Sequence, residues 1–132
     1  MGIELQMVVG TVGVLFLLLM YQGSLVPLNQ GFAWGLGSRD AKQDRTAMQG
    51  RAARTVANHI EGMMLFIPLV VIIEMSNLAS SLTAVAAVLY LVGRVAYAPL
   101  YLMGVPYLRS LAWAVSLTGI VLLGFVVVGS LF

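Results

Sequence analysis

Four long apolar stretches constrain this chain more than any other feature of its sequence. Each is long enough to cross the hydrocarbon core of a bilayer as a helix, which takes about 20 residues. Only 9% of the residues are charged, which is too few for the surface of a soluble protein. We therefore expect an all-α fold, an integral membrane four-helix bundle in a single domain, 1–132. Its helices are expected at approximately 3–28, 45–75, 82–103 and 106–131.

Local signals set the expected helix ends and bends. Pro27 should end the first helix or kink it near its end. Asp44 is expected to cap the second helix. Pro68 and Pro99 should bend the second and third helices, because proline removes a backbone hydrogen bond. Pro106 suits the first position of the fourth helix.

Composition also excludes several classes of site. The chain has no cysteine, so disulfides, thiolate metal sites and a cysteine nucleophile are excluded. The N-terminus lacks a basic region and a cleavage site, so we expect the first apolar stretch to remain in the membrane. The basic residues form no surface interleaved with aromatic residues, so we expect no nucleic-acid partner.

The distribution of Lys and Arg predicts the orientation. Five of the seven lie between Arg39 and Arg54, around the first connection, and Arg109 follows the third connection. The middle connection and both termini have none. Positive charge accumulates on the cytoplasmic side of membrane proteins. We therefore expect both basic connections in the cytoplasm and both termini on the opposite side.

A ladder of polar residues enters the second helix on one face. At about 100° per residue, Arg51, Arg54, Asn58 and Glu61 fall within an arc of roughly 80°. A charged side chain at bilayer depth costs about 2.5–3.5 kcal/mol on insertion scales. This face is therefore expected to contact protein or a wet cavity.

The third helix has a second polar stripe, Tyr90, Arg94, Tyr97 and Tyr101, within an arc of about 60°. Arg94 lies deep in an apolar segment, where an arginine needs a partner, and Glu61 is the expected one. One interpretation is a structural ion pair that fixes helix register. The other is a polar groove that holds a ligand, and the two tyrosines that extend the stripe favour it.

Other polar residues give weaker signals. Arg109 and Ser110 open the fourth helix, either as an interfacial anchor or as part of a site. His59 points about 100° away from the polar ladder and has no second metal-type ligand nearby. We therefore assign it no role and expect no metal site. Glu74 is expected at the opposite membrane face.

Together these residues resemble the MAPEG family, the membrane-associated proteins in eicosanoid and glutathione metabolism. A segment of the first connection, Gly37-Ser38-Arg39-Asp40, is similar to bacterial members. The resemblance covers nearly the whole chain, and it rests on the following patterns: Arg51-x-x-Arg54-x-x-x-Asn58-x-x-Glu61, Arg94-x-x-Tyr97-x-x-x-Tyr101 and Arg109-Ser110.

The resemblance implies a homotrimer in a membrane, for a bacterial protein the inner membrane, with glutathione sites between subunits that open to the cytoplasm. The implied partners are glutathione, a lipophilic substrate and membrane lipids. The implied glutathione-binding residues are Arg54, Asn58, Glu61, Tyr97 and Tyr101, together with Arg51 and Arg94 on the same two stripes.

The same resemblance implies the catalytic residues. The arginine that matches Arg109 faces the glutathione sulfur in relatives, and the serine that matches Ser110 has a role in one branch. Arg39 is implied as a clamp from a neighbouring subunit. One departure is that Gly62 follows the glutamate where many relatives have an aromatic residue.

The expected function is therefore glutathione-dependent: conjugation of the thiolate to lipophilic electrophiles, or reduction of lipid hydroperoxides. One alternative is a member of this fold that has lost catalysis and serves as a membrane interaction protein. A small multidrug-type transporter subunit is the other. It ranks lower because the first helix has only Glu4, at its end, where that class needs an acidic residue at mid-membrane.

Overall fold

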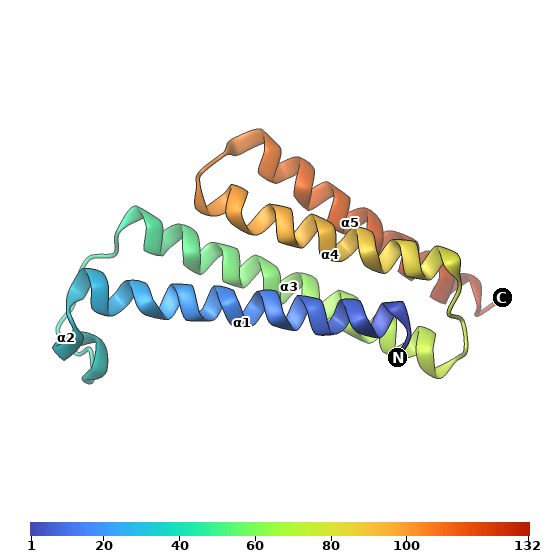
Figure 1. The fold of residues 1–132 in the computed structure, drawn as a ribbon, viewed down its shortest axis with the longest axis horizontal. Helices are drawn as coiled ribbons and strands as arrows, with labels where there is room; N and C mark the ends of the chain where they lie inside the picture. Colours follow the sequence, from blue (N-terminus) through green and yellow to red (C-terminus); the bar gives the residue numbers. More distant parts are fainter.

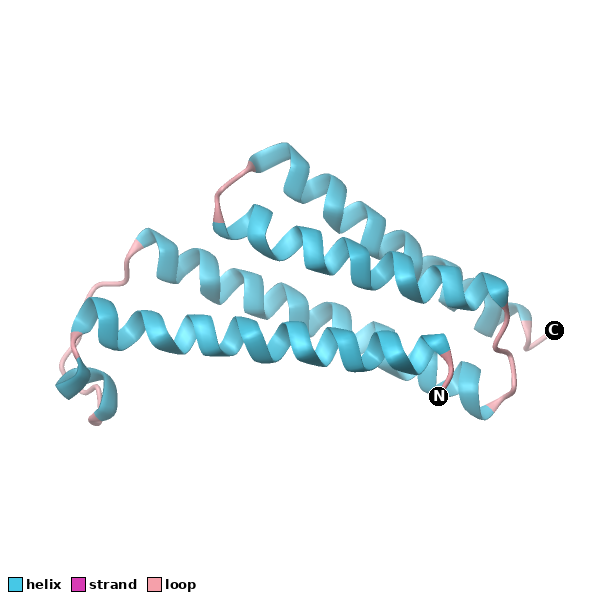
Figure 2. Ribbon diagram, in the orientation of Figure 1, coloured by secondary structure: helices cyan, strands magenta, loops and turns pink.

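Four long helices and one short helix make up the chain in the computed structural model, which describes residues 1–132 (Figure 1). There are no strands (Figure 2). The helices are α1 (Ile3–Gln30), α2 (Phe32–Leu36), α3 (Ala47–Met75), α4 (Ser81–Leu102) and α5 (Pro106–Gly129). All except α2 are long and apolar enough to cross a membrane. This confirms the predicted all-α fold with four membrane-spanning helices.

The long helices are arranged as two pairs (Figure 1). α1 lies beside α3, and α4 and α5 form a tightly packed hairpin. The pairs lie closest at the end that holds both termini, and they separate toward the end that holds α2 (Figure 1). Most polar residues of α3 and α4 lie in the half of the bundle nearer to α2, where Arg51 contacts Leu102 and Arg54 contacts Tyr101.

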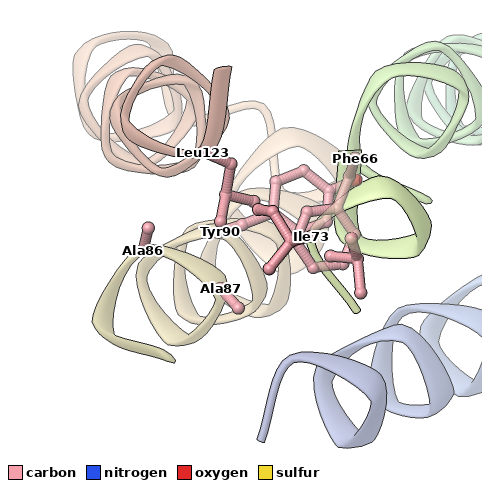
Figure 3. Close-up of a cluster of buried hydrophobic side chains, with 7 residues drawn as sticks. Phe66, Ile73, Ala86, Ala87, Tyr90 and Leu123 are labelled. Carbon is pink, nitrogen blue, oxygen red and sulfur yellow. The ribbon is translucent and has the colours of Figure 1, made fainter. Parts of the chain in front are cut away.

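The hydrophobic core fills the end of the bundle near the termini. The stacked rings of Phe66 and Tyr90 have centroids 3.9 Å apart and join α3 to α4 (Figure 3). The buried residues of this cluster are Phe66, Val70, Ile73, Ala86, Ala87, Tyr90 and Leu123. Glu4 is also buried at this end, where it accepts a hydrogen bond of 2.5 Å from the Thr83 hydroxyl.

The second spanning helix begins later than the sequence suggested, and Asp44 is not its cap. Thr46 is the N-cap of α3: its hydroxyl accepts from the Gln49 backbone N–H at 3.2 Å. In return, the Gln49 side-chain oxygen accepts from the Thr46 backbone N–H at 2.8 Å. This reciprocal pair satisfies two otherwise unpaired N–H groups, which a lone Asp44 could not do.

The first helix continues through Pro27 to Gln30, two residues beyond the expected end. Gly31, at φ 88°, then breaks the chain direction, and its N–H donates to the Pro27 carbonyl. Positive φ is accessible to glycine at little cost, so the helix ends at the glycine and not at the proline. After the connection between α4 and α5, Pro106 is the first residue of α5, as the sequence predicted.

Candidate functional site

The two polar stripes meet at Arg94, which is only 2% exposed. Its Nη1 donates to Asn58 Oδ1 at 2.8 Å, and its Nε donates to His59 Nδ1 at 3.4 Å. Its guanidinium carbon lies 4.5 Å from the centre of the Tyr97 ring. Two neutral side chains of α3 and one aromatic face of α4 therefore hold this buried arginine.

The expected ion pair between Glu61 and Arg94 does not form. Asn58 and His59, about one turn earlier on α3, take the arginine's donors in its place. Glu61 instead lines a cavity together with Arg94, and its side chain is exposed on the single chain. Helical periodicity places both residues on facing stripes, but it does not fix the axial offset between the two helices.

His59 is a site residue that the sequence analysis missed. It is fully buried, and its Nε2 lies 2.9 Å from the Thr11 carbonyl oxygen of α1. A carbonyl has no proton, so His59 donates there from Nε2, which leaves Nδ1 free to accept from Arg94. The histidine therefore links three helices. The only sequence signal for His59 was Arg94, an arginine deep in an apolar segment that needed a nearby hydrogen-bond acceptor.

A second cluster lies closer to the first connection. Arg54 Nε donates to the Tyr101 hydroxyl at 2.8 Å. The Arg109 guanidinium lies over the same ring, 4.9 Å from its centre. Tyr97 and Tyr101 have ring centroids 5.5 Å apart. Residues from α3, α4 and α5 thus bring two guanidinium groups and two phenols together.

Two adjoining cavities run between α3, α4 and α5, and together we call them the groove. The outer chamber has a volume of about 260 Å³ and the inner chamber about 160 Å³. Asn58 and Trp113 line both. The remaining lining of the outer chamber is Tyr97, Arg109 and Ser110, and the polar lining of the inner chamber also includes Glu61, Tyr90, Arg94 and Ser116. Leu65, Leu117 and Ile120 make the inner chamber apolar on its other side.

One residue that lines the inner chamber has a buried polar atom without a hydrogen-bond partner in the chain. The Tyr90 hydroxyl is buried and makes no hydrogen bond. It lies against Gly62, where a Cβ would approach it to 2.9 Å, so glycine keeps this part of the chamber open. A buried hydroxyl without a partner costs free energy.

Arg54 and Tyr101 do not line the groove, but they contact each other beside Arg109 of the outer chamber. Two further predicted site residues also lie outside the groove within one chain. Arg51 donates from Nε to the Leu102 carbonyl at 2.9 Å, which ties α3 to the end of α4. Arg39 is exposed in the first connection, where it donates to the Gly35 carbonyl at 3.0 Å. Arg39 also lines a separate cavity of about 330 Å³ on the α1 side of the bundle. Ligand binding by either arginine stays a prediction.

The groove combines charges of both signs with apolar walls. Arg94 and Arg109 in its lining, and Arg54 beside it, provide donors for anionic groups, and Glu61 provides an acceptor for a cationic group. No group of three or more metal-type ligands is present. The arrangement suits a small zwitterionic ligand that carries more than one anionic group.

Comparison with known proteins adds one match. The sequence model of the MAPEG family matches residues 8–129 of the 132. No curated protein matches the chain, and no solved structure matches it. The matched stretch contains every residue that lines the groove.

Proposed function

The chain belongs to the MAPEG family, whose members include glutathione transferases and peroxidases, and we propose on this basis that it is a glutathione-dependent membrane enzyme. The reaction is conjugation of glutathione to lipophilic electrophiles or reduction of lipid hydroperoxides, with the second substrate taken from the bilayer. The observation that carries this proposal is the groove, where Arg94, Arg109 and Glu61 line chambers with apolar walls, and where Arg54 contacts Tyr101 beside Arg109.

The chemistry of these residues fits glutathione, which has two carboxylates, one amine and one thiol. Arg54 and Arg94 would hold carboxylates, because a guanidinium presents several N–H donors in one plane. Glu61 would hold the amine, and Asn58 would contribute amide hydrogen bonds.

Arg109 and Ser110 are the proposed catalytic residues. Glutathione supplies the thiol when bound, and a thiolate is the reactive nucleophile. Arg109 lines the outer chamber in the first turns of α5, where the helix dipole also favours negative charge. It would therefore stabilise the thiolate. The Ser110 hydroxyl, in the same chamber, would donate a hydrogen bond to the sulfur or to the substrate oxygen.

The exposure of Glu61 supports an assembly in which a neighbouring copy covers the groove, and we propose the homotrimer implied by the family resemblance as that assembly. Glu61 is exposed on the single chain, about 21 Å along α3 from its first residue. Contact between a carboxylate and hydrocarbon at this depth would be costly. A neighbouring copy that covers the groove removes this cost. In that arrangement Arg39 of the neighbour would reach the ligand, and the sites would open to the cytoplasm.

Thermal stabilisation in detergent tests the proposal. Ligand that binds only the folded state raises stability by about 2.7 kcal/mol at 100 times Kd, so millimolar glutathione should raise Tm. Arg54→Ala and Glu61→Ala should abolish most of this shift. Lys42→Ala, which removes an exposed charge outside the groove, should preserve it.

A panel of electrophiles and lipid hydroperoxides would then separate conjugation from peroxidase activity. Binding without turnover of any of them would identify a non-catalytic member of the family. The proposal is wrong if the unmodified protein shows no Tm shift with millimolar glutathione.

A further inference from the structure

We propose that His59 is a positioning residue that orients Arg94 and leaves its positive charge available for the anionic group bound in the inner chamber. The identity of that anion as a glutathione carboxylate rests on the proposed function. The contact between His59 and Arg94 does not depend on it. His59 touches no part of the groove itself, so it acts through the arginine.

The hydrogen bonds around His59 fix its protonation and its ring orientation. Its Nε2 donates to the Thr11 carbonyl of α1 at 2.9 Å, and its Nδ1 accepts from Arg94 Nε at 3.4 Å. Both His59 and Thr11 are fully buried. The ring is therefore a neutral imidazole with its proton on Nε2, held from one side by α1 and presented to α4 on the other.

These contacts leave most of the Arg94 guanidinium free. Of its five N–H donors, Nε contacts His59 and one on Nη1 contacts Asn58, so three remain. Arg94 lines the inner chamber, so a ligand in that chamber lies beside the guanidinium. The two occupied donors lie on the α3 side, which fixes the plane in which the other three project.

The chemistry of the two partners matters as much as their positions. Asn58 and His59 are both neutral, so neither cancels the charge of Arg94. A buried charge without a counter-ion is costly, and the missing counter-ion can come from a bound anion. An ion pair with Glu61 would have satisfied the arginine within the protein and weakened its attraction for a ligand. Neutral acceptors orient Arg94 without that loss.

Two partial replacements distinguish positioning of Arg94 from a purely structural role, in which His59 only ties α1 to α3. His59→Asn keeps an acceptor at the position of Nδ1, toward Arg94, but cannot reach Thr11. His59→Gln keeps a donor at the position of Nε2, toward Thr11, but loses the acceptor for Arg94. His59→Leu removes both hydrogen bonds.

If His59 positions Arg94, His59→Asn should bind glutathione within about threefold of the unmodified protein, while His59→Gln and His59→Leu should each weaken binding about tenfold, or 1.4 kcal/mol. Titration calorimetry measures these affinities, and Tm measures folding separately. His59→Gln binding as tightly as the unmodified protein, or more tightly than His59→Asn, would overturn the inference.

A second measurement needs no glutathione. His59 is the single histidine of the chain, so protein labelled with ¹⁵N-histidine gives the spectrum of one ring. We expect a proton on Nε2 and none on Nδ1, and a shift of the Nδ1 resonance in Arg94→Lys and Arg94→Met. Arg54→Met, which changes an arginine bonded to Tyr101 and not to His59, should leave the resonance in place.

The glutathione titration and the histidine spectrum test the proposed function and the positioning role of His59 separately. A proton on Nδ1, or an Nδ1 resonance that does not respond to changes at Arg94, overturns the positioning role whatever glutathione does. Failure of the unmodified protein to bind glutathione overturns the proposed function, while the spectrum still decides whether His59 holds Arg94.

Discussion

Arg94 and Arg109 line the same groove but have different surroundings. Arg94 is buried and held by two neutral hydrogen-bond acceptors. Arg109 is partly exposed and stacks over the Tyr101 ring, in the outer chamber near Ser110. A buried, doubly bonded arginine suits binding of a fixed anion, whereas a partly exposed one at a chamber mouth suits stabilisation of a charge that develops during the reaction.

Arg109→Ala should therefore impair chemistry more than binding. We expect turnover to fall about 10²-fold, the usual effect of removing one group that stabilises developing charge, with glutathione affinity changed less than threefold. The ultraviolet absorbance of bound thiolate, titrated against pH, should move to higher pH, and Arg109→Lys should restore part of the effect. If Arg109→Ala keeps both its turnover and its titration, Arg109 is an interfacial anchor and the catalytic role moves to Arg94, Tyr97 or Tyr101.

At the scale of helices, the sequence predicted the helical segments well, but it predicted less well which residues of neighbouring helices face one another. Apolar length alone identifies the four spanning helices, because hydrocarbon leaves the backbone few other choices. The start of α3 was misplaced because the reciprocal bonds of Thr46 and Gln49 outweigh the single cap offered by Asp44. His59 was missed because a helical wheel gives a direction but not the neighbouring helix in that direction.

For the groove residues too, the sequence predicted which helix faces meet, but not which side chains pair. Asn58 and Arg94 were predicted to lie on facing stripes, and they form a direct hydrogen bond. The pairing of Glu61 with Arg94 was wrong, since a shift of about one turn along the axis decides which side chain of α3 reaches the arginine. Such a shift depends on packing between helices, to which residues distant in sequence contribute.

Close packing of α4 against α5 holds one wall of the groove, and Gly119 makes it possible. A Cβ at this position would collide with the Ala86 carbonyl oxygen and lie 2.8 Å from the Tyr90 backbone nitrogen. Gly119→Ala should therefore push the helices apart at an overpacking cost of about 1–3 kcal/mol and lower Tm. Gly124→Ala is the matched control, because a Cβ there meets nothing within 4 Å and Tm should stay the same or rise. Equal Tm values for the two variants would show that the helices do not approach this closely.

At the scale of the whole molecule, charge is divided between the two ends of the bundle. Arg39, Lys42 and Arg45 lie in the connection between α2 and α3, at one end, while both termini and the connection between α3 and α4 lie at the other end (Figure 1). The acidic residues Glu4 and Glu74 lie in the helices near that second end, and Glu74 Oε1 is buried without a partner there. The groove opens toward the basic end, because Arg109 and Ser110 line its outer chamber at the start of α5. The orientation of the bundle therefore decides which compartment supplies the ligand.

Single cysteines test this orientation, and the natural chain offers a cysteine-free background. Lys42→Cys lies in the exposed basic connection, and Ala79→Cys lies in the exposed connection between α3 and α4 without disturbing the Ser80 cap of α4. The excess of Lys and Arg at the basic end predicts that Lys42→Cys reacts only with reagents that reach the cytoplasm. Ala79→Cys should react with membrane-impermeant maleimide added outside intact cells, and Lys42→Cys should react with it only after the membrane is opened. The reverse pattern would place the mouth of the groove outside the cytoplasm, away from the cytosolic pool of glutathione, and would remove the ligand supply on which the proposed enzyme depends.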